Sequence, residues 1–140
     1  MQVKVKKSQA DYFRRLALKE ARATGKEIQA YLIGRVVSPN LTVIDEFRYT
    51  KEYGSQTTGE VCWYKADVDE LIAEATAAGQ RVLGDCHSHP NWDAVLSPDD
   101  YKKHIEDGQR ITGICSIQNN RTRLRFWMAE SALAAEIIYV

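Results

Sequence analysis

Residues 81–107 read RVLGDCHSHPNWDAVLSPDDYKKHIED, and this order joins a strand to a helix through a short polar loop. The largely apolar run at 81–86 predicts a strand, and Ser97 followed by Pro98 predicts the first turn of a helix. Ser97 and Asp100 also have the spacing of a capping box, which by itself requires no metal. A strand and a helix this close in sequence predict an α/β or α+β domain.

The hydrophobic pattern predicts further helices and strands on both sides of this segment. Helices are expected at 8–23, from Asp67 to the stop at Gly79, and at 98–107. Strands are expected at 3–5, 28–37, 42–49, 60–64, 81–86, 111–117 and 122–128, and the last five residues are expected to form a strand or a helix edge. Residues 50–59 read as a loop beside the site. The 140 residues are the length of one ordinary domain, so we expect a single domain over residues 1–140.

Composition excludes several classes of function. Lys plus Arg and Asp plus Glu both total 19, so no net charge favours nucleic acid as a partner. No apolar run approaches the roughly eighteen residues that span a bilayer, and no signal peptide begins the sequence, so we expect no membrane association and a cytoplasmic protein. Three widely spaced cysteines, Cys62, Cys86 and Cys115, show no C-x-x-C pair and are interpreted as reduced core residues.

His87 and His89 are the first candidate metal ligands. Side chains at positions i and i+2 of an extended segment project to one face, so both imidazoles can reach one ion while Ser88 faces away. Asp100, at the start of the next helix, can supply a carboxylate. Three nitrogen and oxygen ligands with one open position are typical of a catalytic zinc site, so the pattern predicts one Zn²⁺ per chain.

Several neighbouring residues admit more than one interpretation. His104 can be a fourth ligand, a partner of a ligand, or a solvated residue on the helix surface, and we expect the solvated position. Asp85 shares strand parity with His87 and is expected to be structural or to support a ligand. Trp92 can contact substrate or anchor its loop. The row Arg121, Arg123 and Arg125 can bind a partner, although a solvated strand face is the expected reading.

The pattern H-x-H-x7-S-x-x-D, complete here from His87 to Asp100, resembles the zinc motif of the JAMM (MPN+) metalloproteases. In that family a glutamate precedes the first strand after the N-terminal helix, and the position that matches it here is Glu27. The resemblance implies a curved mixed β-sheet flanked by helices. It also implies zinc on His87, His89 and Asp100, with Glu27 as general base and Ser97 as a hydroxyl donor to the developing oxyanion.

The resemblance further implies a zinc metallopeptidase or isopeptidase. Its substrate would be a peptide or isopeptide bond at the C-terminal tail of a ubiquitin-like or small sulfur-carrier protein. The alternative is a non-enzymatic MPN-type scaffold or assembly module. A zinc nucleoside deaminase is excluded because its H-x-E and P-C-x-x-C signature is absent from the sequence. The residues predict no particular oligomeric state.

Overall fold

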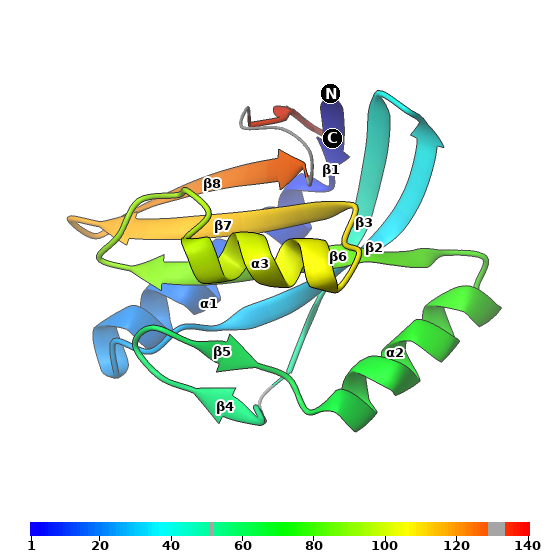
Figure 1. The fold of residues 1–140 in the computed structure, drawn as a ribbon. Coiled ribbons are helices and arrows are strands. Elements are labelled where there is room, and N and C mark those ends of the chain that lie inside the picture. Colours follow the sequence, from blue (N-terminus) through cyan, green and yellow to red (C-terminus); the bar gives the residue numbers. More distant parts are fainter. Residues whose placement is uncertain (51, 129–133) are drawn as a thin grey trace.

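The structure of the protein is a computed structural model that describes residues 1–50, 52–128 and 134–140 (Figure 1). Its main element is a seven-stranded sheet in the order β8-β7-β6-β2-β3-β1-β9. The strands are β1 (Gln2–Val5), β2 (Gln29–Ser38), β3 (Leu41–Tyr49), β6 (Arg81–Pro90), β7 (Ile111–Gln118), β8 (Arg121–Met128) and β9 (Glu136–Tyr139). Three pairs are parallel, β1 with β3, β1 with β9 and β6 with β7, and the other three are antiparallel, so the sheet is mixed.

The sheet is curved until its two edges approach each other. A bridge joins Trp127, on β8, to Ala134, just before β9, and the Ala135 N–H donates to the Phe126 carbonyl at 2.8 Å. At Gly34, where the β2–β3 register shifts, a Cβ would lie 1.9 Å from the Val43 carbonyl oxygen, so only glycine allows this close approach. The expected curved mixed sheet with flanking helices is confirmed.

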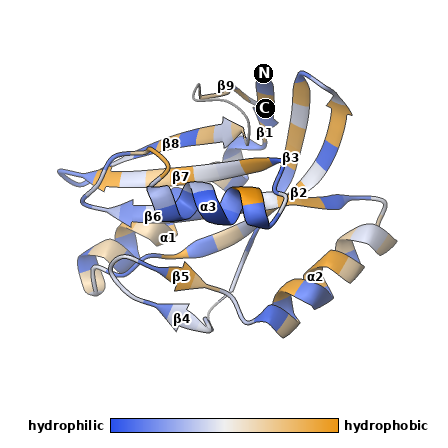
Figure 2. Ribbon diagram, in the orientation of Figure 1, coloured by the Kyte–Doolittle hydropathy of each residue, from blue (hydrophilic) through white to orange (hydrophobic). Residues whose placement is uncertain are grey.

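In the described part of the chain, three helices flank the sheet. Helix α1 (Lys7–Ala23) buries Ala10, Phe13 and Ala17 in the main core, where Phe13 packs against Phe47. Helix α2 (Lys65–Ala77) packs Leu71 and Ala75 on a smaller apolar cluster. Helix α3 (Pro98–Glu106) lies along β6 and β7 on the face opposite α1 (Figure 1). Figure 2 shows α3 as mostly hydrophilic, and Asp100 and His104 of this helix make polar contacts with His89 on β6 and Thr112 on β7.

Several predicted boundaries differ from the observed ones. The expected strand at 60–64 is only β5 (Val61–Cys62), and it pairs with β4 (Ser55–Gln56), a strand inside the expected loop. Helix α2 begins at Lys65, two residues before the predicted Asp67, without a side-chain cap. Strand β6 continues to Pro90, because its last residues pair with β7. The C-terminal segment forms strand β9 beside β1.

All three cysteines are free. Cys86 and Cys115 lie in the core as expected, but Cys62 is only half-buried because β5 lies outside the main sheet, so the core prediction is wrong for that residue. No helix among the described residues is long and apolar enough to cross a membrane.

Candidate metal centre

His87 and His89 lie on the face of β6 that α3 covers. Both are buried, at 5% and 4% exposure, and the residue between them points to the opposite face. There the Ser88 hydroxyl accepts a hydrogen bond from the Ile28 N–H at 2.9 Å. The alternation of side chains along an extended strand therefore places both imidazoles on one side, as predicted.

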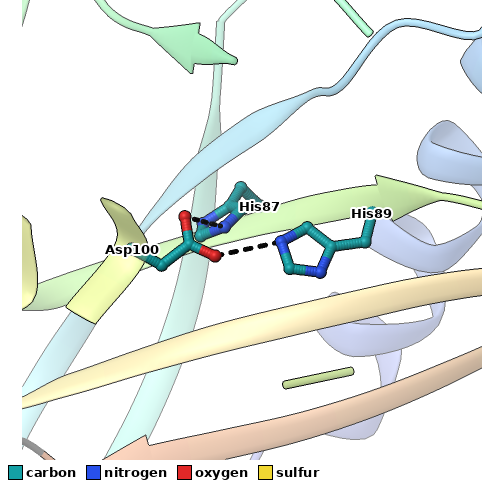
Figure 3. A group of neighbouring side chains, drawn as sticks. All are labelled: His87, His89 and Asp100. Carbon is teal, nitrogen blue, oxygen red and sulfur yellow. Dashed lines mark hydrogen bonds and ion pairs between the residues drawn. The ribbon is translucent and has the colours of Figure 1, made fainter. Parts of the chain in front are cut away.

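The capping box at the start of α3 brings Asp100 to these imidazoles. The Ser97 Oγ accepts from the Asp100 N–H at 3.0 Å, and the Ser97 N–H donates to Asp100 Oδ2 at 3.0 Å. The Asp100 carboxylate then places Oδ1 3.0 Å from His87 Nε2 and Oδ2 3.1 Å from His89 Nε2 (Figure 3). The same interaction that begins the helix thus orients the third candidate ligand.

The hydrogen bonds of the two rings decide which nitrogen of each is available to a cation. His87 Nδ1 lies 3.0 Å from Asp85 Oδ2, and His89 Nδ1 lies 2.8 Å from the Asp93 carbonyl oxygen. Both partners are acceptors, so each Nδ1 carries the proton and each Nε2 of a neutral ring presents a lone pair. These lone pairs face the carboxylate of Asp100, which is also an acceptor. Three acceptors that meet at one point have no donor among them, so a cation between them is needed to satisfy all three.

The geometry also suits a metal. The ligand atoms of His87, His89 and Asp100 all lie within 4.8 Å of one another. Ligands at about 2.0–2.2 Å from zinc lie about 3.3 Å apart in a tetrahedron, close to the 3.0 and 3.1 Å between the carboxylate oxygens and the imidazole nitrogens. Among the described residues, His87 Nε2 is buried and has no hydrogen-bond partner, because its contact with Asp100 lacks hydrogen-bond geometry. The three residues fit a zinc ion.

The electrostatics of the cluster favour positive charge at the same point. Burial opposes protonation of His87, but the carboxylates of Asp100 and Asp85 outweigh it and raise the pKa of His87 to about 10. For Asp100, burial opposes ionisation, yet the two imidazoles and the Ser97 N–H hold the pKa of its carboxyl well below its usual range. The cluster therefore stabilises a cation, which in the absence of metal is a proton.

Glu27 approaches the cluster from the chain segment just before β2. The Ser88 N–H donates to the Ile28 carbonyl at 3.0 Å, which extends the β2–β6 pairing beyond Gln29 and His87. Glu27 consequently lies beside β6, with its N–H bonded to the Thr57 carbonyl at 2.8 Å. Its side chain is 7% exposed, and burial raises the pKa of its carboxyl to about 6, although His87 and His89 oppose this rise.

A cavity of about 350 Å³ connects the predicted site residues. Its walls include Glu27, Ser97, His87 and Asp100, and His89 contacts Asp100 at its edge. The structure thus brings together all five residues that the sequence singled out. The backbone of Glu27 is held by the Thr57 carbonyl, and the Ser97 oxygen caps α3 by accepting from the Asp100 N–H, a role that does not use the hydroxyl proton.

The prediction for His104 is wrong, because its side chain is buried at 1% exposure rather than solvated. Its Nδ1 contacts the Thr112 hydroxyl on β7, which fixes α3 to the sheet. Asp100 and His104 are four residues apart and so share one face of the helix. Because Asp100 faces the sheet, His104 must do so as well, and this spacing was the signal available in the sequence.

The remaining candidates lie around the site. Asp85 contacts His87, as its strand parity indicated, and its neighbour Gln29 is a site residue that the sequence analysis did not single out. The ring of Trp92 lies 5.0 Å from that of His89 and is 47% exposed, so it both packs on a candidate ligand and faces solvent. In the arginine row, Arg121 and Arg123 are exposed and Arg125 is half-buried, and a partner for this row stays a hypothesis.

Two imidazoles from a strand and a carboxylate from a helix N-terminus, within a curved mixed sheet, define a candidate mononuclear metal centre in an α+β fold. The family model of prokaryotic homologs of the JAB domain matches residues 9–130, and the chain belongs to this family. The resemblance to the JAMM (MPN+) motif is thereby confirmed at the level of the JAB/MPN family. A search of curated proteins finds no match.

Two solved structures, with TM-scores of 0.74 and 0.63, support the fold. A protein from Desulfitobacterium hafniense, determined in solution, superposes with a TM-score of 0.74 at 17% identity, covering 99% of this chain and 92% of that one. A protein from Salinibacter ruber gives a TM-score of 0.63 at 17% identity, covering 98% and 91%. A JAB1/MPN domain protein from Archaeoglobus fulgidus gives 0.48 at 14% identity, covering 99% and 96%.

Proposed function

We propose that the protein is a zinc-dependent metallopeptidase or isopeptidase. The proposal rests on one observation above all: two buried imidazoles, each with Nδ1 beside an acceptor, and a carboxylate converge where Glu27 and Ser97 line the same cavity. Three protein ligands without thiolate, and a cavity at the fourth position, are the plan of a catalytic rather than a structural zinc site.

The residues divide the chemistry of amide hydrolysis among them. His87, His89 and Asp100 would hold the ion. Zinc, when bound, supplies a Lewis acid that polarises a carbonyl and lets water lose a proton near neutral pH, which makes it a nucleophile. Ser97 lines the cavity, and its hydroxyl would donate a hydrogen bond to the carbonyl oxygen as negative charge develops there.

Glu27 would move the proton. Its carboxylate would take a proton from the attacking water and deliver it to the departing amine, which cannot leave as an anion. Its burial suits this task, since it places the pKa of Glu27 at about 6, nearer to neutrality than that of an ordinary carboxyl, and so eases both steps.

The substrate class that we propose is the C-terminal tail of a ubiquitin-like or small sulfur-carrier protein. It follows from the resemblance to the JAMM metalloproteases. The polar walls of the cavity, which include Glu27 and Gln29, suit the polar backbone of a peptide segment rather than an apolar small molecule.

The test is to measure zinc per chain together with hydrolysis of linear fusions in which a ubiquitin-like or sulfur-carrier protein precedes a reporter. Wild type is expected to hold one zinc and to cleave at the end of the tail. Glu27→Gln should retain zinc and lose cleavage, because the amide cannot accept the proton. Asp100→Ala should lose both, because it removes a ligand.

Glu20→Gln is the matched control, because Glu20 also accepts from Gln56, whose amide holds the Glu27 carbonyl, yet it does not line the cavity. It should cleave like wild type. Unchanged cleavage in both Glu27→Gln and Asp100→Ala would reject the assignment. A wild type that holds no zinc, and whose stability a chelator does not alter, would instead favour the non-enzymatic scaffold.

A further inference from the structure

We infer that Asp85 and Gln29 are positioning residues that hold the ring of His87 with Nε2 directed at the metal position. We further infer that Gln29 ties this orientation to the β4–β5 hairpin. The inference rests on the proposed function, since it assigns how one of the proposed zinc ligands is prepared. It concerns residues outside the ligand motif, one on β6 and one on β2.

Asp85 is the acceptor that fixes the His87 ring. Its carboxylate is 6% exposed, and its Oδ2 lies 3.0 Å from His87 Nδ1. A carboxylate oxygen at Nδ1 accepts the Nδ1 proton, fixes the tautomer and the orientation of the ring, and so directs Nε2 at the metal position.

Gln29 in turn fixes the carboxylate of Asp85. Its Nε2 donates to Asp85 Oδ2 at 2.9 Å, and its Oε1 accepts from the Trp63 backbone N–H at 3.2 Å. The amide can adopt only this orientation, because a backbone N–H donates only and a carboxylate accepts only. Without Gln29, one side chain fewer would hold Asp85 in place.

The same glutamine connects the centre to the hairpin. Trp63 directly follows β5, and its indole Nε1–H donates to the Gln29 carbonyl at 3.0 Å. Tyr53, just before β4, accepts from the Gln29 N–H at 3.0 Å. Both ends of the hairpin are therefore anchored on the residue whose side chain steadies Asp85. A shift of the hairpin would be transmitted to the ring of His87 through three hydrogen bonds, between Trp63 and Gln29, between Gln29 and Asp85, and between Asp85 and His87.

Zinc affinity separates this positioning role from simple packing. The experiment is a competition titration of zinc against a chromophoric chelator for wild type, Asp85→Asn and Gln29→Met. Mutating the carboxylate partner of a metal-binding histidine costs about 10–100-fold in affinity, so the zinc Kd of Asp85→Asn, in which a weaker amide acceptor replaces the carboxylate, should rise by that factor. Gln29→Met keeps the volume but removes the amide, and its Kd should rise by about tenfold.

Imidazole ¹⁵N spectra of the zinc-loaded proteins give a second measurement, which would not change if Asp85 and Gln29 served only in packing. In wild type the His87 Nδ1 proton should exchange slowly with water, because it is buried against Asp85. In both variants it should exchange faster. Thermal unfolding of the metal-free proteins checks that each folds, and Gln29→Met carries the test if Asp85→Asn does not.

The chain offers a matched control. Gln80 Nε2 donates to Asp45 Oδ2 at 3.2 Å, a pair of the same chemistry, and Gln80 precedes the first residue of β6 while His87 lies near its last. Gln80→Met and Asp45→Asn should leave the zinc Kd unchanged. If both Asp85→Asn and Gln29→Met bind zinc with wild-type affinity, this inference is overturned while the proposed function stands. Failure of wild type itself to bind zinc would overturn the proposed function as well.

Discussion

Ser97 combines two roles that substitution can separate. Its Oγ accepts from the Asp100 N–H at 3.0 Å and so begins α3, while in the proposed reaction its hydroxyl donates to the carbonyl oxygen. Alanine removes both roles. Among helix caps, threonine and glycine are nearly equivalent and both exceed alanine, but only threonine keeps a hydroxyl. Threonine and glycine therefore form a matched pair that differs in the chemical role alone.

The magnitudes follow from this contact. Losing the serine cap costs about 1 kcal/mol in Ser97→Ala and a few tenths in Ser97→Gly, because the bond from the Ser97 N–H to Asp100 Oδ2 uses the backbone and remains. For a domain of this size about 1 kcal/mol lowers Tm by roughly 4 °C. Removing one oxyanion donor lowers kcat by about 10²–10³-fold, so Ser97→Gly should lose that factor relative to Ser97→Thr.

Two assays test the pair. Unfolding of the chelator-treated proteins, followed by circular dichroism, should place Ser97→Ala below Ser97→Gly and Ser97→Thr. Turnover of the reporter fusion should place Ser97→Thr far above Ser97→Gly. An alanine variant as stable as wild type would refute the capping contribution. A glycine variant that turns over as fast as the threonine variant would refute the hydroxyl's part in catalysis.

Three further outcomes are expected. Free zinc at 100 times its Kd should add about 2.7 kcal/mol to the free energy of unfolding of wild type and nothing to that of Asp100→Ala, which thermal unfolding with and without zinc will show. The folded-state pKa of Glu27 lies at about 6, above its ordinary 4.5, so in the metal-free protein the stability it contributes is complete below pH 4.5 and is lost as the pH rises through 6. Glu27→Gln should therefore gain stability relative to wild type as the pH rises across this range. If the urea midpoints of the two proteins differ by the same amount at every pH, this expectation is contradicted. Alkylation followed by mass spectrometry should label the half-buried Cys62 first, since Cys86 and Cys115 are buried and burial raises the pKa of both thiols.

What could be predicted from the sequence is what depends on neighbours along the chain. The alternation of a strand places His87 and His89 on one face, and the capping box places Asp100 at the first turn of α3, whatever surrounds them. The main strands and α1 followed from their hydrophobic periodicity for the same reason. Glu27 was found only through its resemblance to a family motif, because nothing local distinguishes it from other acidic residues.

The tertiary structure decided whatever depends on pairing between distant segments. The β2–β6 register sets Gln29 opposite His87 and so assembles the contact with Asp85, and the packing of α3 on β7 buries His104. The weak strand β4 forms only because β5 returns beside it. A sequence pattern reports the conformation of a few consecutive residues, whereas register and burial are set by the whole sheet, through hydrogen bonds between residues more than fifty positions apart.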